Sequence, residues 1–346
     1  TDWCGTSSNG RFAFCQRAEE WGGQPAMRYD QAGWMFPIDG RAPQYIAKAS
    51  RAVGLSLPRA VVDRVYRHFL TWNVHSDPAF QDIQGRGLRI GEVSVVGLLS
   101  EPDNARACAW LVDQFGWNTI SRVPGFRTLC DLCEGVGKDG NGAPCLVCGW
   151  RGYHAPLFPH NHGRDDYAIF GRDENGLLFW GMIRALPWEK GSGRPKYQML
   201  STSSDIHASL AGKPKYHVAG LVHGTEEVWF TEGILKATVA AKYLHRTVIG
   251  LSGTNVDAPT IRALRDLLRF WGTKRAVIAY DSDKRDMDTN GELLYHGVVA
   301  GEQALGSALA TVVPSVLTAE WDREDGKGID DLLTKAAGDY WLKEMP

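Results

Sequence analysis

Acidic residues follow two segments in the last third of the chain that have the composition of buried strands. Glu232 ends VWFTE, and Asp281 and Asp283 follow RAVIAY with one residue between them. In an extended chain these two aspartates point the same way, and neighbouring carboxylates repel each other unless a cation lies between them. A further acidic pair, Asp330 and Asp331, opens a short amphipathic helix in GKGIDDLL. Because carboxylate oxygens suit Mg²⁺ or Mn²⁺, these acids predict a divalent-metal site.

Four of the seven cysteines form two tight pairs. Cys130-x-x-Cys133 and Cys145-x-x-Cys148 have the spacing of a tetrahedral Cys₄ zinc site, and neighbouring glycines let the backbone turn toward the thiolates. We therefore expect structural Zn²⁺ at these four cysteines. Cys108 lies on an apolar face of a predicted helix, which indicates a core residue.

The elements that must position the acids alternate between strand and helix from Val228 onward. Strands are predicted at 228–233, 247–253, 275–283 and 311–319, and helices at 234–245, 261–272 and 291–309. This alternation indicates a parallel sheet flanked by helices. Functional groups of such sheets gather at the carboxyl ends of the strands, where Glu232 and Asp281 are expected to lie.

The middle of the chain has a different pattern. YAIFGR and LLFWGMIRA alternate around DENG, which predicts a β-hairpin. Between Arg184 and His217 the sequence has six basic residues against two acidic ones. Such a segment beside an acidic site fits a groove for template and nucleotide phosphates, and the alternative is a solvated loop. Earlier in the chain, residues 57–72 and 103–115 have apolar positions at helical spacing.

The composition is that of a globular protein of two or three domains, with 346 residues, 44% of them hydrophobic and 23% charged. No apolar run is long enough to span a membrane, and the first ten residues do not form a signal segment. We therefore expect a cytoplasmic protein with reduced thiols. The net charge of −2 argues against a protein that binds nucleic acid over its whole surface.

The order and spacing of the acids resemble the Toprim domain of primases, topoisomerases and certain nucleases. In that family a Glu-Gly, here Glu232-Gly233, precedes an Asp-x-Asp by about fifty residues. The resemblance implies that Glu232, Asp281 and Asp283 bind divalent metal for phosphoryl transfer. Asp331, together with Asp330, would complete the acidic cluster.

The segment before the acids looks like the basic RNA-polymerase subdomain of bacterial DnaG-type primases. The matching positions are Arg172, Gly176, Arg184, Lys196, Tyr197 and Ser201, and GRGL at 85–88 resembles a helix entry of the same family. TEGILKA and KGIDDLL are more similar to primase-like proteins of phages and mobile elements. The resemblance and the local positive charge imply that nucleotides or nucleic acid are contacted by Arg172, Arg184, Lys196, Tyr197 and Lys213.

One position departs from that family. DnaG-type primases have an aspartate four residues after the Toprim glutamate, and this chain has Lys236. A protonated lysine cannot bind a metal ion. We therefore expect either fewer metal ions at the catalytic site or an ammonium group at Lys236 that contacts phosphate.

These features predict an α/β plus α+β fold, in which a Toprim-type parallel sheet flanked by helices follows a DnaG-like basic subdomain and an inserted Cys₄ zinc module. Cys4 and Cys15 belong either to a partial zinc ribbon or to a pair of unconnected buried thiols. The predicted regions are a partial zinc-ribbon-like segment at 1–42, a helical region at 43–122, the zinc module at 123–155, the basic subdomain at 156–225 and the Toprim domain at 226–346.

The function that these expectations favour is that of a DNA primase. Such an enzyme joins NTPs on a single-stranded DNA template, with structural Zn²⁺, catalytic Mg²⁺ or Mn²⁺ and a replicative helicase as partner, here in phage or mobile-element replication. A Toprim nuclease would use the same acids to cleave DNA. A non-catalytic module would use the zinc and basic elements to recruit a replication helicase, because the chain has no GxxxxGK[ST] loop of its own.

Overall fold

The computed structural model describes most of the chain in two compact units, Thr1–Gly54 and Leu55–Pro346. Besides the backbone of short strands between Cys4 and Pro37, the described residues are 57–72, 77–129, 153–159, 164–189, 191–200, 214–220, 226–287, 295–335 and 339–345. The four cysteines at 130–148 and Lys213 lie outside these ranges, so the zinc site and the role of Lys213 stay predictions. No helix among the described residues is both long and apolar enough to cross a bilayer.

The first unit is built from short strands, which the sequence did not predict. An antiparallel sheet contains, in spatial order, β1 (Cys4–Thr6), β2 (Phe12–Cys15), β6 (Gly33–Pro37) and β5 (Met27–Tyr29). A separate pair consists of β3 (Glu20–Trp21) and β4 (Gln24–Pro25). The register places Cys4 opposite Cys15, so the two cysteines are neighbours across the strands.

The centre of the second unit is a six-stranded sheet whose middle four strands are parallel, as the alternating pattern predicts. Its strands, in spatial order, are β13 (Tyr216–Ala219), β15 (Thr247–Leu251), β14 (Glu227–Glu232), β16 (Arg275–Ile278), β17 (Ser315–Trp321) and β18 (Tyr340–Glu344). The two outer strands, β13 and β18, are antiparallel to their neighbours.

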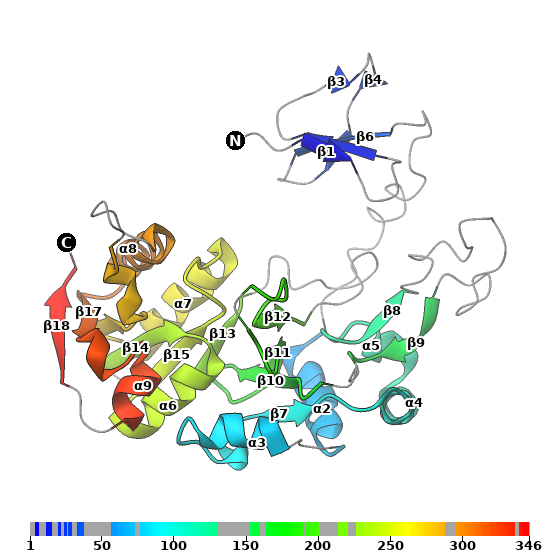
Figure 1. Ribbon diagram of the computed structural model, residues 1–346, viewed down its shortest axis with the longest axis horizontal. Helices are drawn as coiled ribbons and strands as arrows, with labels where there is room; N and C mark the ends of the chain where they lie inside the picture. The colour runs from blue at the N-terminus through cyan, green and yellow to red at the C-terminus, as the bar shows by residue number, and fades with distance from the viewer. Residues whose placement is uncertain are drawn as a thin grey trace. The chain divides into compact units, whose positions relative to one another are not determined.

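Helices cover both faces of this sheet, with α7 and α8 on one side and α6 and α9 on the other (Figure 1). The bounds are α6 Ile234–Leu244, α7 Ala258–Trp271, α8 His296–Ala310 and α9 Ile329–Thr334. Local sequence sets the ends of α7, because the Asp257 side chain accepts a hydrogen bond from Thr260 N at 3.0 Å and Gly272 closes the helix at a φ of +67°. The apolar stripes of these helices face the sheet and build its core.

A second, four-stranded sheet contains the predicted hairpin. Its order is β12 (Tyr197–Met199), β11 (Leu178–Arg184), β10 (Tyr167–Arg172) and β7 (Val95–Gly97). In the hairpin turn, Asp173 Oδ1 accepts hydrogen bonds from the backbone N–H groups of Asn175 and Leu177, each at 2.9 Å.

Short helices and a two-stranded ribbon surround this second sheet. The helices are α2 Arg59–Leu70, α3 Asp77–Gln84, α4 Glu101–Phe115 and α5 Trp117–Ile120, with the short helix η2 at Ile90–Glu92. The ribbon pairs β8 (Arg127–Leu129) with β9 (Tyr153–Leu157). Cys108 of α4 is fully buried in the core beneath these helices, as predicted.

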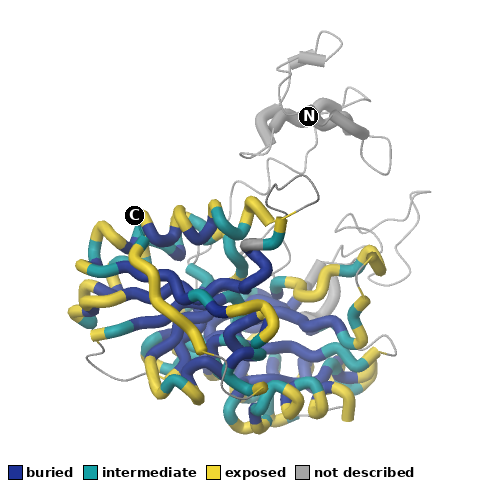
Figure 2. The backbone as a smooth tube through the Cα atoms, turned by 60° about the vertical axis from the view of Figure 1, so that its left-hand side comes forward, coloured by how far each residue is buried: buried dark blue, intermediate teal, exposed yellow. Residues whose placement is uncertain are grey.

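The two sheets share one hydrophobic core, and the buried part of the chain runs continuously through both (Figure 2). Trp180 of β11 donates a hydrogen bond from Nε1 to the backbone carbonyl of Tyr216 in β13, at 2.6 Å. Ile169 and Met182 belong to the same cluster as Phe230 and Ile234. Residues of the two sheets are therefore held in fixed positions relative to one another.

Candidate active site

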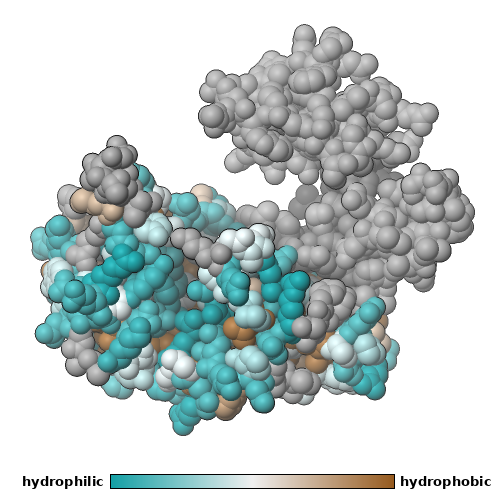
Figure 3. Space-filling model, viewed as in Figure 1, coloured by the Kyte–Doolittle hydropathy of each residue, from teal (hydrophilic) through white to brown (hydrophobic). Residues whose placement is uncertain are grey.

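A cavity of about 660 Å³ lies where the carboxyl end of β14 and the start of α6 face α3 and β12. The described surface is mainly hydrophilic on the face seen in Figure 3. Five of the six charged residues predicted for the catalytic and divalent-metal site line the cavity, and the sixth, Asp283, does not: the five are Glu232, Lys236, Asp281, Asp330 and Asp331. Lys196 and Tyr197 line it from the other sheet, so the predicted acidic and basic regions meet here.

Glu232 is the last residue of β14, and the chain turns immediately into α6 at Gly233, whose φ of +84° favours glycine. Burial of the Glu232 carboxyl raises its pKa to about 7, against the opposing effect of Lys236. Asp281 and Asp283 add to the rise. Within the described part of the chain, Glu232 has no hydrogen-bond or ion-pair partner, which leaves its carboxyl group available to a cation.

Asp281 and Asp283 lie in a turn and not in an extended strand, so the predicted extended conformation of these residues is wrong, although both carboxylates approach the same ammonium group, that of Lys327. β16 ends at Ile278, and the residues after Asp281 form the short helix η4 (Ser282–Arg285). The cause is a tertiary contact: Ser282 donates from its backbone N–H to the carbonyl of Lys327 at 2.8 Å. Both aspartates are nevertheless buried close to each other.

Each of these aspartates has a lysine as its partner. Lys236 forms an ion pair with Asp281 Oδ1. Lys327 Nζ lies 2.5 Å from Asp283 Oδ2 and 3.9 Å from Asp281 Oδ2. The negative charge of the pair is thus neutralised by two ammonium groups.

Lys236 remains protonated in this setting. Burial by itself would lower its pKa, but the carboxylates of Asp281, Asp330 and Glu232 outweigh burial and raise the pKa above its ordinary value. The Lys236 side chain passes Gly328, where a Cβ atom would lie 3.1 Å from Nζ. The ammonium therefore fills the space between the turn after β16 and the start of α9.

The acidic pair at the start of α9 divides into a buried and a more exposed residue. Asp330 Oδ2 accepts a hydrogen bond from Arg86 Nη1 at 2.9 Å, whereas its Oδ1 is buried without a partner among the described residues. Asp331 Oδ2 accepts a hydrogen bond from Gly328 N at 3.4 Å and lies near Lys335. Asp330, more than Asp331, is therefore the acid that faces the other buried charges.

Two cations of the site, Arg86 and Lys327, were not among the residues that the sequence predicted. Arg86 lies in GRGL, which was noted only as a helix entry, and it follows the end of α3. Lys327 lies between two glycines in GKG, a pattern that reads as a loop. The GRGL motif was the available sequence signal for Arg86. Lys327 is the first residue of the KGIDDLL motif, but only the two aspartates of that motif were assigned a role.

Basic groups form one wall of the cavity. Lys196 approaches the cavity from β12's side, and its pKa is lowered by burial and then by the neighbouring charges of Arg184 and Arg86. A cation that is crowded by other cations gains most from an anionic ligand. The wall therefore suits a phosphate group, facing the acids on the opposite side.

Arg184 is buried behind this wall and holds other side chains in place. It forms a bidentate ion pair with Asp82, with nitrogen–oxygen distances of 2.7 and 3.1 Å. Its Nη1 also donates to the hydroxyl of Tyr197 at 3.1 Å, and the Tyr167 hydroxyl donates to Asp82 at 2.5 Å. Arg184 is thus a positioning residue for Asp82 and Tyr197.

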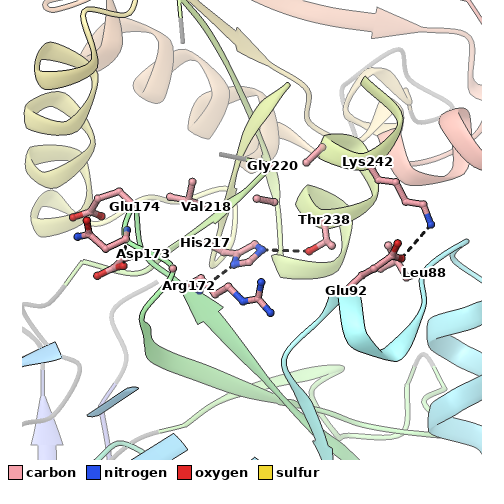
Figure 4. A pocket seen from close by; sticks show the side chains of 14 residues that line it. Leu88, Glu92, Arg172, Asp173, Glu174, His217, Val218, Gly220, Thr238 and Lys242 are labelled. Atoms are coloured by element: carbon pink, nitrogen blue, oxygen red, sulfur yellow. Dashed lines mark hydrogen bonds and ion pairs between the residues drawn. The ribbon is translucent and has the colours of Figure 1, made fainter. Parts of the chain in front are cut away.

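Arg172, another predicted contact residue, lines a different cavity of about 570 Å³ (Figure 4). Its guanidinium donates to Ser94 Oγ at 2.9 and 3.2 Å, and its backbone N–H donates to His217 Nδ1 at 3.0 Å. The His217 ring donates from Nε2 to Thr238, and burial lowers its pKa to about 3. The structure therefore places Arg172 in a different cavity from Glu232 and Asp281.

The donor set can be tested against a divalent cation. No three carboxylate, histidine or cysteine side chains of the described residues already form a metal-binding group. Asp330 Oδ1 is, however, buried without a partner among the described residues, and Glu232, Asp281 and Asp283 supply further carboxylate oxygens close to one another. Carboxylate oxygens are the ligands that Mg²⁺ and Mn²⁺ prefer, so the chemistry of this donor set suits either ion, but the ion pairs of Asp281 with Lys236 and of Asp283 with Lys327 occupy some of these oxygens.

No protein-family model and no curated protein sequence matches the chain. Solved structures match its fold. The zinc-binding and RNA-polymerase domains of the Aquifex aeolicus primase superpose with a TM-score of 0.50 and 14% identity, over 88% of this chain and 62% of that one. The RNA-polymerase domain of Mycobacterium tuberculosis primase DnaG superposes with a TM-score of 0.51 and 13% identity, over 81% and 80% of the two chains. The protein therefore has a mixed α/β fold similar to that of DnaG-type primase catalytic cores.

Proposed function

We propose that the protein is a primase-like nucleotidyltransferase that joins ribonucleotides on a single-stranded DNA template. The observation that carries the proposal is one cavity with acids on one side, at the carboxyl end of a parallel sheet, and cations on the other. The fold shared with primase RNA-polymerase domains supports this reading. The six-stranded sheet would then be a Toprim domain in function as well as in sequence pattern.

Glu232, Asp281 and Asp283 would hold Mg²⁺ or Mn²⁺, with Asp330 and Asp331 beside them. When bound, such an ion neutralises triphosphate charge and orients the attacking hydroxyl. Glu232 must lose its proton before it binds a cation, and its pKa of about 7 places that step near neutral pH.

The chain's own cations would bind the substrate. Lys196, Lys236 and Arg86 line or border the cavity and would contact phosphate oxygens through charge-assisted hydrogen bonds. Tyr197, which is 38% exposed, offers its ring to a base while Arg184 fixes its hydroxyl. Lys213 would extend the basic groove, and Zn²⁺ at Cys130, Cys133, Cys145 and Cys148 would stabilise the module that precedes it.

The biological setting is part of the proposal. TEGILKA and KGIDDLL are similar to primase-like proteins of phages and mobile elements, and such a setting would supply a replicative helicase as partner. The proposed nucleotidyl transfer does not depend on this biological setting.

A single assay separates the proposed activity from its alternatives. The full chain is incubated with single-stranded DNA, labelled NTPs and Mg²⁺ or Mn²⁺. Oligoribonucleotides support the proposal, shortened DNA indicates a nuclease, and bound but unchanged DNA indicates a non-catalytic module. Glu232→Gln should abolish product, whereas Glu226→Gln, an exposed glutamate of the same sheet region, is the matched control. Full activity of Glu232→Gln would overturn the catalytic assignment.

A further inference from the structure

Lys327 is far more exposed than Lys236 and Arg86, the two other cations that pair with the buried aspartates of this site, whose side chains are 21% and 19% exposed. Its ammonium lies 2.5 Å from Asp283 Oδ2, yet its side chain is 57% exposed while that of Asp283 is 6% exposed. The ion pair thus joins a fixed, buried carboxylate to a long side chain that is largely in solvent. Holding such a chain in one rotamer costs conformational entropy, so the pair is easily opened.

The backbone beneath Lys327 is held firmly. The Ser282 hydroxyl shares its one hydrogen between the carbonyls of Gly326 and Lys327, with Oγ–oxygen distances of 2.9 and 3.1 Å, and Trp321 Nε1 donates to the Gly326 carbonyl at 2.9 Å. Ser282 is the residue between Asp281 and Asp283. The Cα of Lys327 is therefore tied to the same turn as the aspartates, and only the side chain is free to move.

Lys236 lacks this freedom. It extends from the first turn of α6, its side chain is 21% exposed, and it lies against Gly328 between Asp281 and Asp330. If a divalent cation binds the aspartates, Lys236 has little space to withdraw, whereas Lys327 has solvent on one side and the cavity, which it already lines, on the other.

We propose that Lys327 is a displaceable counter-ion and a substrate-binding residue of this site. Without divalent metal, its ammonium neutralises Asp283 and Asp281. When the metal binds these carboxylates, the ammonium leaves them and turns into the cavity, where it binds the phosphates of a nucleoside triphosphate. The proposal rests on the proposed function, because it assumes a divalent-metal site at Asp281 and Asp283.

This exchange follows from charge balance. Two buried aspartates next to Glu232 repel one another, so the metal-free site needs positive charge to remain folded. A bound divalent ion supplies that charge, and Lys327 and the metal then compete for the same oxygens. The released ammonium adds a cation where negative phosphate arrives.

The first measurement is Mn²⁺ binding to the full chain, followed by the EPR signal of the free ion. Lys327→Met removes the competitor and should bind Mn²⁺ more tightly than the wild type, by about threefold to tenfold. Lys327→Arg keeps the charge and should bind Mn²⁺ as the wild type does. Lys274→Met is the matched control, since Lys274 forms an exposed ion pair with Glu226 and should leave Mn²⁺ affinity unchanged.

The second measurement uses a non-hydrolysable nucleoside triphosphate at saturating Mn²⁺. Lys327→Met should bind it about threefold to tenfold more weakly than the wild type, the opposite direction to the metal effect. Equal Mn²⁺ affinity in wild type and Lys327→Met, or equal nucleotide affinity, overturns the role of Lys327 and leaves the proposed function intact. If neither protein binds Mn²⁺ in a way that Glu232→Gln abolishes, the proposed function itself fails.

Discussion

Lys236 and Asp281 form an ion pair at the floor of the cavity, with the ammonium reaching from the first turn of α6 to Oδ1 of the carboxylate. Asp330 and Glu232 add further negative charge around the same ammonium. A fixed positive charge therefore lies inside the acidic cluster. Where DnaG-type primases have an aspartate, this chain therefore has a lysine whose ammonium offsets part of the negative charge of Glu232, Asp281 and Asp330.

Removal of that charge should destabilise the protein. Lys236→Met leaves Asp281 and Asp330 buried with less compensation, and it should lower the free energy of unfolding by about 2 kcal/mol in buffer without Mg²⁺ or Mn²⁺. Urea unfolding measures this loss, and added Mn²⁺ should restore part of it. Lys274→Met serves as the exposed control. An unchanged midpoint for Lys236→Met would mean that the ion pair contributes nothing to stability.

We expect Lys236 to limit how many divalent ions the site holds. Lys236→Asp replaces the internal ammonium by a carboxylate, and it should bind additional Mn²⁺ per chain relative to the wild type. Lys236→Ala should instead weaken nucleoside triphosphate binding if the ammonium contacts phosphate. Mn²⁺ titration and nucleotide binding measured on both variants separate the two roles, and unchanged values in both variants would contradict each of them.

Much of the site's scaffold could be predicted from the sequence. The parallel strands are continuous apolar runs, the intervening helices have apolar stripes, and strand ends in such sheets converge, which brings Glu232 close to Asp281. Each of these features follows either from a local sequence pattern or from the general rule that strand ends of a parallel sheet converge. The hairpin around Asp173 likewise follows from its turn residues.

The remaining parts depend on contacts between distant segments. Arg86 and Asp330 are 244 residues apart in the chain, and nothing in either segment indicates that they meet. The turn at Asp281–Asp283 was predicted to be extended because the hydrogen bonds from Ser282 to Gly326 and Lys327 are tertiary. The sequence placed Arg184 in a basic segment that was expected to contact nucleic acid. In the structure its side chain is buried and paired with Asp82, a residue about a hundred positions earlier in the chain.

The pKa of Glu232 gives a prediction for the dependence of stability on pH. Since its pKa in the folded protein is about 7, above the ordinary value of 4.5, the protonated form is favoured by folding. That stabilisation is complete below pH 4.5 and is lost as the pH rises to about 7. The Glu232→Gln variant keeps a neutral side chain at every pH. Its free energy of unfolding, relative to that of the wild type, should therefore rise by up to about 3 kcal/mol between pH 4.5 and pH 7.

Urea unfolding at pH 5 and pH 8, without added Mg²⁺ or Mn²⁺, measures that difference. Glu226→Gln is the control because Glu226 is exposed and pairs with Lys274. Parallel pH profiles for wild type and Glu232→Gln would show that burial does not perturb this carboxyl group. In the presence of Mn²⁺ the difference should shrink, since the metal stabilises the ionised form.

Arg184 and Lys196 should respond differently in DNA binding. Lys196 borders the cavity, so Lys196→Ala should reduce the slope of log affinity against log salt concentration by about one unit. Arg184→Met should leave the slope unchanged, because this guanidinium is paired with Asp82 and cannot reach phosphate. It should instead lower the free energy of unfolding by about 2 kcal/mol, since Asp82 loses its bidentate partner and keeps only the Tyr167 hydroxyl and the more distant Arg86. A reduced salt slope for Arg184→Met would show that Arg184 contacts DNA phosphate after all.

The predicted zinc site can be tested separately from the cavity. Elemental analysis of the purified chain should give about one zinc per chain if the central cysteine pairs alone bind metal, and about two if Cys4 and Cys15 take part in a second site. Cys133→Ser should lose the central zinc, whereas Cys108→Ala should retain it because Cys108 is buried in the core away from solvent. Retention of all zinc in Cys133→Ser would contradict the Cys₄ assignment. Unchanged Mn²⁺ binding in the same variant would show that the module stabilises its own segment and does not hold the acidic site together.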